Sequence, residues 1–154
     1  MAADNLFDLK IITPDRVFYS GKASFLELNT VEGEIGIYKN HIPMTTVLEP
    51  GIATITEEGG NKKEAALHTG FMEILGDRIT ILAEIAEWPD EIDRNRAQEA
   101  KIRAERRLQN DKSNINITRA ELALHKALVR IELADHVTTV SYTHLRAHET
   151  CADL

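Results

Sequence analysis

The sequence has a single cysteine, Cys151, and this count excludes a framework of internal disulfide bonds. Only 5% of its 154 residues are aromatic, so a core has to be built mainly from isoleucine, leucine and valine. No run of about 18 consecutive apolar residues occurs, which excludes a transmembrane helix. Residues 1–10 lack the basic and apolar regions of a signal peptide, so we expect the protein to stay in the cytoplasm.

Positive charge is scarce in the first part of the chain. Residues 1–90 carry 7 Lys and Arg against 15 Asp and Glu, whereas residues 91–137 carry 10 against 8. Nucleic-acid binding is disfavoured, because phosphates require a basic face and the larger part is acidic. The mildly basic second part suits an acidic partner surface.

The first part of the chain, residues 1–87, has the alternation that is typical of short β-strands. In LFDLKII, Phe7, Leu9 and Ile11 alternate with their neighbours, which places these three side chains on one face of a strand. Two further short strands are expected on either side of Gly21. The spacing of strand and turn signals predicts an antiparallel β-sandwich or flattened barrel of about nine strands.

Three glycine-containing turns are expected in this sandwich. The Pro-Gly pair at residues 50–51 fits a type II turn, in which Gly51 takes a positive φ. The Gly-Gly-Asn sequence at 59–61 and the Gly-Asp pair at 76–77 fit hairpin turns between neighbouring strands.

After residue 88 the apolar spacing changes to three and four, which is typical of helices. Asp90 is expected to cap the first helix, and Asn116 the second, with the polar segment 109–116 between the two helices. The apolar residues at helical spacing are, in the first helix, Ala97, Ala100, Ala104 and Leu108, and in the second Ile117, Ala120, Leu124, Ala127, Ile131 and Ala134. The short connection predicts an antiparallel two-helix hairpin over residues 88–137.

The alanines of these two series, here called the alanine seam, bury little apolar area. At about 0.8 kcal/mol per buried methylene, an alanine seam gives several kcal/mol less than a leucine seam. Two interpretations stay open from this feature alone. The hairpin is either suited to rearrangement or simply a bundle of modest stability.

No catalytic site emerges from the sequence. Four histidines lie in unlike contexts: His41, His68, His125 and His136. His144 and His148 are four residues apart but lack a third ligand, and no metal-binding motif is present. A small β-sandwich enzyme with a metal on His41 and His68 is a hypothesis that bound metal in the purified protein would support.

Four segments carry a resemblance to a known family. They are GEIGIYKNHIPMTTVLEPG at 33–51, GFMEILGDRITILAEIAE at 70–87, IDRNRA at 92–97 and LHKALVRIEL at 124–133. In this order they resemble the ε subunit of bacterial F-type ATP synthases. The resemblance implies an α+β fold, with an N-terminal antiparallel β-sandwich or flattened barrel and a C-terminal antiparallel two-helix hairpin, as the residue pattern also predicts.

The resemblance implies a regulatory subunit without catalytic activity of its own. Its sandwich would dock on the γ subunit and the membrane c-ring, and would help to couple rotation to proton or sodium flow. Its helices would alternate between a compact hairpin and an extended form that enters the catalytic αβ assembly and blocks ATP hydrolysis. The helix residues expected to meet acidic surface there are basic: Arg103, Arg106, Arg107 and Lys126. The expected location is peripheral, on the cytoplasmic face of the bacterial plasma membrane.

The IDRNRA segment fits the I/L-D-x-x-R-A pattern through which some ε subunits bind ATP. The resemblance implies a regulatory ATP site on Glu87, Ile92, Asp93, Arg96, Ala97, Arg103, Lys126 and Arg130. Lys126 departs from the pattern, because an ammonium does not replace the bidentate guanidinium of the arginine in the ATP-binding form. The alternative for Asp93 is a capped first helical turn with intrahelical contacts. No cofactor is otherwise required, and a free-standing ATP-sensing module is the alternative function.

The last segment, VSYTHLRAHETCADL at 140–154, continues neither the helical spacing nor the family resemblance. We therefore expect residues 138–154 to be a non-native or disordered tail.

Overall fold

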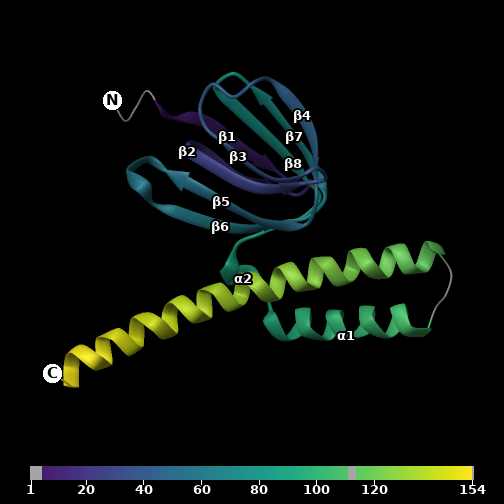
Figure 1. Ribbon diagram of the computed structural model, residues 1–154. Helices are drawn as coiled ribbons and strands as arrows, with labels where there is room; N and C mark the ends of the chain where they lie inside the picture. The colour runs from purple at the N-terminus through teal and green to yellow at the C-terminus, as the bar shows by residue number, and fades with distance from the viewer. Residues whose placement is uncertain (1–4, 111–113, 154) are drawn as a thin grey trace. The chain divides into compact units, whose positions relative to one another are not determined.

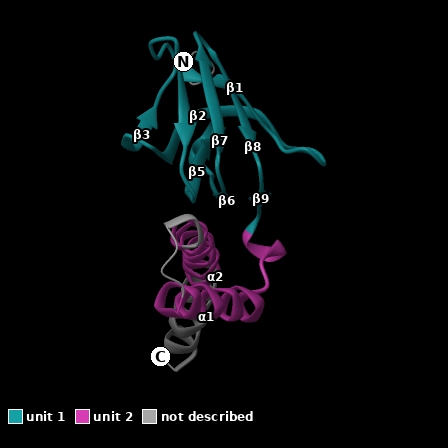
Figure 2. Ribbon diagram, turned by 90° about the vertical axis from the view of Figure 1, so that its right-hand side faces the viewer, with its two compact units in different colours: residues 1–88 teal, residues 89–154 magenta. Residues whose placement is uncertain are grey.

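The computed structural model describes the backbone of residues 5–110 and 114–153, and side chains within 5–110 and 117–136. The chain divides into two compact units, which Figure 2 colours separately: Met1–Trp88, here the sandwich unit, and Pro89–Leu154, here the helical unit. The first consists of strands and the second of two long helices (Figure 1). The predicted α+β class, a β-sandwich followed by two helices, is confirmed.

The strands of the sandwich unit are β1 (Phe7–Ile12), β2 (Val17–Thr30), β3 (Gly33–Ile37), β4 (Met44–Leu48), β5 (Gly51–Glu57), β6 (Lys62–Leu67), β7 (Gly70–Leu75), β8 (Arg78–Ala83) and β9 (Ala86–Glu87). They follow the order β1-β8-β7-β4-β2-β5-β6-β9, while β3 also pairs with β2. An additional β1–β2 pairing closes β1, β8, β7, β4 and β2 into a ring, which makes the unit a flattened barrel. The β1–β8 pair is parallel, and the other paired strands described here are antiparallel.

Strand β2 runs without interruption through Gly21, so the prediction of two short strands around this glycine is wrong. Gly21 pairs with Leu9 of β1. The Tyr19 side chain covers Gly21, because a Cβ atom there would lie 3.0 Å from the Tyr19 hydroxyl. The register of β2 against β5 shifts between Ala23 and Phe25, and such a bulge bends a strand. Strand β2 is therefore one long bent strand that pairs with both β1 and β5.

The predicted turn glycines divide into two groups. Gly76 takes a positive φ of 61° between β7 and β8, as a tight hairpin requires, and Gly59 takes 87° within the short 3₁₀ turn Glu58–Gly60. Gly51 is not among the positive-φ residues, so the prediction of a left-handed glycine at this turn is wrong. Gly51 is instead the first residue of β5, where a side chain would collide with Asn29.

Large aliphatic side chains fill the interior of the sandwich unit. Phe7, Leu9 and Ile11 are buried on one face of β1, which confirms the predicted alternation. The largest fully buried side chains of the unit are Phe7, Leu9, Ile11, Leu26, Ile37, Leu48, Ile55, Met72, Ile74, Ile79 and Ile81. Every one of them lies on a strand, so the barrel interior is the core of this unit.

The helical unit begins with the 3₁₀ turn η3 (Pro89–Glu91), continues with α1 (Arg94–Asn110) and ends with α2 (Asn114–Asp153). The prediction that Asp90 caps the first helix is wrong, because Asp90 lies inside η3. The cap is Asp93, whose carboxylate accepts a hydrogen bond from the Arg96 backbone N–H at 3.2 Å. The second helix begins at Asn114, two residues before the predicted cap at Asn116.

The two helices pack side by side through the predicted seam. Ala97, Ala104, Ala120 and Ala127 are buried, and the other predicted seam positions are half-buried: Ala100, Leu108, Ile117, Leu124, Ile131 and Ala134. The side chains of Val129 and Leu133 are also buried, although the predicted seam omits them. Small side chains thus account for the fully buried positions of the seam.

The backbone of α2 is helical through Asp153, past the point where the seam ends. Side chains from residue 137 onward lie outside the described residues, and with them His144, His148 and Cys151. The assignment of 138–154 as a non-native or disordered tail stays a prediction.

Candidate functional site

The most conspicuous surface of the sandwich unit is a row of exposed apolar side chains that crosses five neighbouring strands. Val47 of β4 is paired with Phe71 of β7, Phe71 with Leu82 of β8, Leu82 with Ile12 of β1, and Ile12 with Val17 of β2. Four of the five are strongly exposed: Val17 53%, Val47 42%, Phe71 57% and Leu82 52%. These five residues are called the apolar row below.

A shallow groove of about 530 Å³ follows the middle of the apolar row. Ile12, Pro14, Phe71 and Leu82 are among the residues that line it. Gly70 forms part of the same groove, and any side chain at Gly70 would collide with the Leu82 backbone carbonyl. This glycine therefore permits the close approach of β7 and β8 that aligns Phe71 with Leu82.

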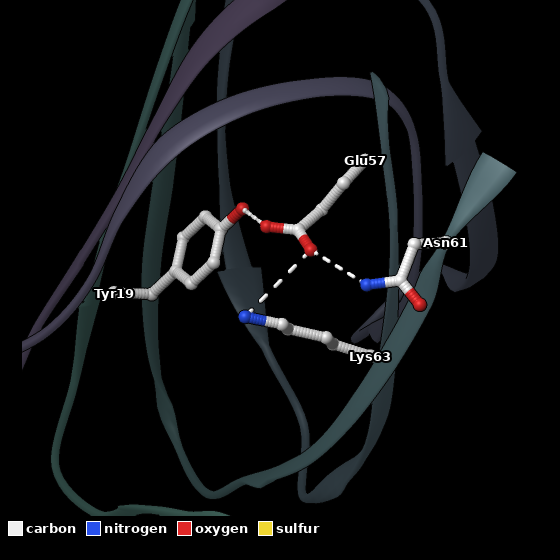
Figure 3. Close-up of polar contacts among 4 residues, drawn as sticks. All are labelled: Tyr19, Glu57, Asn61 and Lys63. Carbon is white, nitrogen blue, oxygen red and sulfur yellow. Dashed lines mark hydrogen bonds and ion pairs between the residues drawn. The ribbon is translucent and has the colours of Figure 1, made fainter. Parts of the chain in front are cut away.

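A second feature is a polar cluster at the end of the β5–β6 hairpin (Figure 3). The Tyr19 hydroxyl donates a 2.7 Å hydrogen bond to Glu57, and the Asn61 side-chain amide donates another at 3.1 Å. The Lys63 ammonium lies 3.6 Å from the same carboxylate. The Tyr19 hydrogen bond, more than the neighbouring charge, lowers the pKa of Glu57, while burial and Glu57 together raise the pKa of Tyr19.

This cluster borders the last residue of the sandwich unit, Trp88. The Trp88 ring stacks on Phe18 with centroids 4.3 Å apart and meets the edge of Tyr19 at 6.2 Å. The Lys63 ammonium lies 5.9 Å from the Trp88 ring, within cation–π range. Aromatic and ionic contacts thus hold the chain firmly at the point where it leaves the sandwich unit.

Glu87, a predicted nucleotide-site residue, already has a protein partner. Its carboxylate lies 3.2 Å from Nε2 of His68, a side chain with no exposed surface. The other ring nitrogen of His68, Nδ1, is buried and has no hydrogen-bond partner among the described residues. A proton on Nε2 therefore satisfies the contact, with His68 as donor and Glu87 as acceptor.

The predicted nucleotide residues around the start of α1 have helix-forming roles in this structure. Asp93 caps the helix, and its backbone carbonyl also accepts from the Ala97 N–H at 3.0 Å. Ala97 is buried, Ile92 is half-buried and the Arg96 side chain is exposed. The capping alternative of the sequence analysis thus describes the geometry of Asp93.

The remaining cationic residues of the predicted site lie on both helices. Arg103 is exposed on α1, whereas Lys126 and Arg130 are half-buried on α2, one helical turn apart. Both α2 residues already have interaction partners. Arg106 and Arg107 are exposed beside Arg103, so α1 presents a cluster of three arginines.

An ion pair that the sequence pattern does not predict joins the start of α1 to α2. Arg94 Nε donates a 2.7 Å hydrogen bond to the Asp135 carboxylate, and this bond raises the pKa of the Arg94 guanidinium. Both side chains are about half exposed. The 41-residue separation gives no local signal of such a pair.

The histidines of the metal hypothesis have other contacts. His68 is paired with Glu87, and His41 is a half-buried loop residue whose Nδ1 lies 2.9 Å from the Ile42 carbonyl oxygen. In the part of the chain that the structure describes, no group of three or more His, Cys, Asp or Glu residues is placed to hold a metal ion. Within those same residues, no helix has the length and apolarity needed to cross a membrane.

Comparison with known proteins defines the class. The model of the β-sandwich domain of the ATP synthase delta/epsilon chain matches residues 6–89, and that of its long α-helix domain matches residues 90–135. The chain therefore belongs to the delta/epsilon chain family of ATP synthases.

Three relatives carry the name ATP synthase epsilon chain. The ATP synthase epsilon chain of Caldanaerobacter subterraneus subsp. tengcongensis is 44% identical over 85% of this chain and 95% of its own. The epsilon chain of Exiguobacterium sp. is also 44% identical, and the match covers 85% of this chain and 97% of the relative. The epsilon chain of Clostridium novyi is 41% identical, and the match covers 82% of this chain and 96% of the relative. The resemblance to the ε subunit is confirmed.

Solved structures share the fold. A chain from the Euglena gracilis mitochondrial ATP synthase, solved with its OSCP, F1 and c-ring, gives a TM-score of 0.74 at 24% identity, over 84% of this chain and 81% of its own. A chain from the central stalk and c-ring of the Tetrahymena thermophila mitochondrial ATP synthase gives a TM-score of 0.54 at 16% sequence identity. This match covers 82% of this chain and 95% of that chain.

Sequence reasoning found the helix series and the Asp93 segment but missed the apolar row. The signal was present in the sequence, because Ile81-Leu82-Ala83 and Phe71-Met72 each place apolar residues at consecutive positions of a strand. Strict alternation predicts one apolar face, so consecutive apolar residues indicate that both faces are covered. The alignment of Phe71 with Leu82 additionally requires the strand register.

Proposed function

We propose that this chain is a non-catalytic central-stalk subunit that couples γ rotation to the c-ring and inhibits ATP hydrolysis through its helices. The coupling ion would be a proton or a sodium ion. Membership of the epsilon chain family supports the stalk role, and the apolar row is the observation that supports docking. We place the subunit at the periphery of the cytoplasmic face of the bacterial plasma membrane, within the complex.

The apolar row is the proposed γ-docking surface. Exposed Phe71 and Leu82 lie side by side, and with Val47 of β4 and Val17 of β2 they form an apolar strip across the sheet face. Such a strip marks a protein interaction site. The loop after β3 supplies a second exposed apolar contact, through Tyr38 and Ile42, and we assign this loop to the c-ring.

The proposed inhibition uses the helical unit in an extended form. The alanine seam gives little apolar burial, and the exposed Arg94–Asp135 pair adds a contact that water and salt weaken. A hairpin held this way needs only a modest differential affinity to open when a partner binds the separated helices. The exposed arginines of α1 suit an acidic surface of the αβ assembly.

Two measurements on the assembled complex test this function. Wild-type protein should co-purify with the γ subunit, and Phe71→Ser should weaken that association. Removal of residues 89–154 should raise the rate of ATP hydrolysis while γ binding through the sandwich unit is kept. Equal hydrolysis rates with and without residues 89–154 would contradict inhibition by the helices and leave coupling alone.

Regulatory ATP binding is the second candidate, and it includes the alternative of a free-standing ATP-sensing module. The IDRNRA segment lies at the start of α1, and Arg96 is exposed and available for a phosphate. Binding would require Glu87 to leave or share His68, and Lys126 and Arg130 to leave or share their present partners. Calorimetric titration with Mg-free ATP at millimolar concentration should give heat that Arg96→Ala removes. Absence of heat from the wild type would remove this candidate.

A further inference from the structure

The apolar row occupies only one end of the outer face of β2, β1 and β8. Along β1, Asp8 and Lys10 point to the same side as Ile12, because alternate residues of a strand share a face. Lys10 is paired with Ser20 of β2 and Thr80 of β8. The next positions along the face place Asp8 between Lys22 of β2 and Arg78 of β8.

These residues form a second groove, of about 590 Å³, that adjoins the groove of the apolar row. Its polar lining residues are Asp8, Lys10, Ser20, Lys22, Arg78 and Thr80. Ile12 lines both grooves, so an apolar region and a polar region meet at this residue. One continuous face therefore has two parts of different chemistry.

The polar part carries unpaired positive charge. Asp8 lies 3.7 Å from Lys22, whereas Lys10 and Arg78 have no hydrogen bond or ion pair among the described side chains. We call Lys10, Lys22 and Arg78 the basic flank. It stands out because residues 1–90 carry 15 Asp and Glu against 7 Lys and Arg. Two further carboxylates lie near the basic flank: Glu73 of β7, which is paired with Thr80, and Asp77, whose backbone carbonyl accepts a hydrogen bond from the Asp8 N–H.

We propose that the basic flank binds carboxylate side chains of the same subunit that covers the apolar row. The partner surface would then be an apolar strip bordered, over β2, β1 and β8, by Asp or Glu residues. This inference rests on the proposed function, in which that partner is γ. An apolar strip alone neither attracts a partner from a distance nor fixes its orientation. The charges of the basic flank would do both, because they accelerate the encounter with the partner and favour one orientation of the strip against it.

A partner protein fits this groove better than a small anion does. The Asp8 carboxylate lies among the three cations and repels a compact ligand such as phosphate, which would have to sit against it. Separate carboxylates on a protein surface reach Lys10 and Arg78 individually and leave the Asp8–Lys22 pair intact. The continuity with the apolar groove at Ile12 also favours one large occupant.

The test measures the association rate with the purified γ subunit of the same complex at several salt concentrations. The Lys10→Glu/Arg78→Glu variant should associate at least about tenfold more slowly at low salt, and its rate should lose most of the salt dependence. The matched control is Lys39→Glu/Lys62→Glu, which makes the same change of net charge outside this face. Its rate should change much less. Lys10→Gln/Arg78→Gln should give an intermediate rate.

Two results separate this inference from the proposed function. If Phe71→Ser weakens γ binding while the glutamate variant behaves as its control does, the basic flank has no role and the inference is overturned. If wild-type protein does not bind γ at all, the proposed docking function fails and this inference fails with it. The thermal unfolding midpoints of the charge variants should match that of the wild type, because Lys10, Lys62 and Arg78 are exposed and Lys39 is only half-buried.

Discussion

The two units of this chain differ in how many large side chains they bury, although the helical unit also buries Val129 and Leu133. The interior of the sandwich unit is filled by leucine, isoleucine and phenylalanine on strands that close into a barrel, whereas the fully buried positions of the predicted helix seam are alanines. Each leucine-to-alanine difference forgoes about 2 kcal/mol of apolar burial. Less apolar area therefore holds the helix pair together, and the proposed rearrangement would cost the helical unit less free energy than it would cost the sandwich unit.

The largest expected effect comes from a cavity in the sandwich core. Ile81→Ala should lower the free energy of unfolding by about 2–5 kcal/mol, because Ile81 has no exposed surface and the barrel cannot collapse onto the space left. Urea unfolding followed by the fluorescence of Trp88 reports on this unit directly. Ile102→Ala, on an exposed face of α1, is the control and should leave the Trp88 transition in place. A loss below about 1 kcal/mol for Ile81→Ala would contradict the assignment of a tightly packed core.

A large side chain in the alanine seam should separate the helices and spare the sandwich. Ala104→Leu overpacks a buried position and should destabilise the hairpin by about 1–3 kcal/mol. Hydrogen exchange should then accelerate in α1 and in the facing part of α2, because most of the stability of a helix in a protein comes from its packing, while the strand amides stay protected. Glu105→Leu adds the same side chain at the neighbouring exposed position and should leave the exchange pattern unchanged. Equal exchange in both variants would show that the seam is not a close contact.

Loss of the helix cap should have a smaller effect. Asp93→Ala removes the acceptor for the Arg96 N–H and should cost about 1 kcal/mol of helix stability. Asp93→Asn keeps a side-chain oxygen and should cost much less. The exchange rates of the first-turn amides of α1 check this order. If these amides exchange at the wild-type rate in Asp93→Ala, the cap does not contribute to the stability of α1.

The smallest expected effect is the pH dependence of the Tyr19–Glu57 contact. The Tyr19 hydrogen bond lowers the pKa of Glu57 below its ordinary value of 4.5, so the unfolded chain takes up the proton first as pH falls. The stabilisation is therefore full above that value and is lost as pH falls through the lower pKa of the folded state. Burial and Glu57 raise the pKa of Tyr19, so stability also falls as pH rises above the ordinary tyrosine value of 10.0.

Tyr19→Phe should accordingly be less stable than the wild type at neutral pH, and the difference should narrow in acid. The variant should also lack the alkaline loss due to Tyr19. Urea unfolding across pH, followed at Trp88, measures both trends. A difference that is constant from acid to neutral pH would contradict the hydrogen bond to Glu57.

The sequence predicts the units well because each has a local periodicity. Alternation places Phe7, Leu9 and Ile11 in the core, and the three-and-four spacing places Ala97 and Ala104 at the helix contact. Features that depend on partners distant in the chain were predicted wrongly or missed. Gly21 stays within β2 because Tyr19 and β1 support it, although an isolated glycine signals a break.

The candidate sites show the same limit. Asp93 can be read from the sequence as a helix-terminal residue, but the choice between Asp90 and Asp93 depends on the 3₁₀ turn at Pro89. The apolar row requires the register of five strands, and the Arg94–Asp135 pair requires the helix packing. Neither can be obtained from local spacing.

The central claim is that the helices separate while the sandwich stays intact. Spin labels at Glu105→Cys and Glu121→Cys, both exposed, would measure the distance between α1 and α2 in the assembled complex, in a Cys151→Ser background. A control pair at Thr45→Cys and Lys62→Cys would measure the sandwich. We predict two distances for the helix pair, with populations that shift between ATP-rich and ADP-rich conditions, and one constant distance for the control. A single unchanged distance between the helices under every condition would contradict the account.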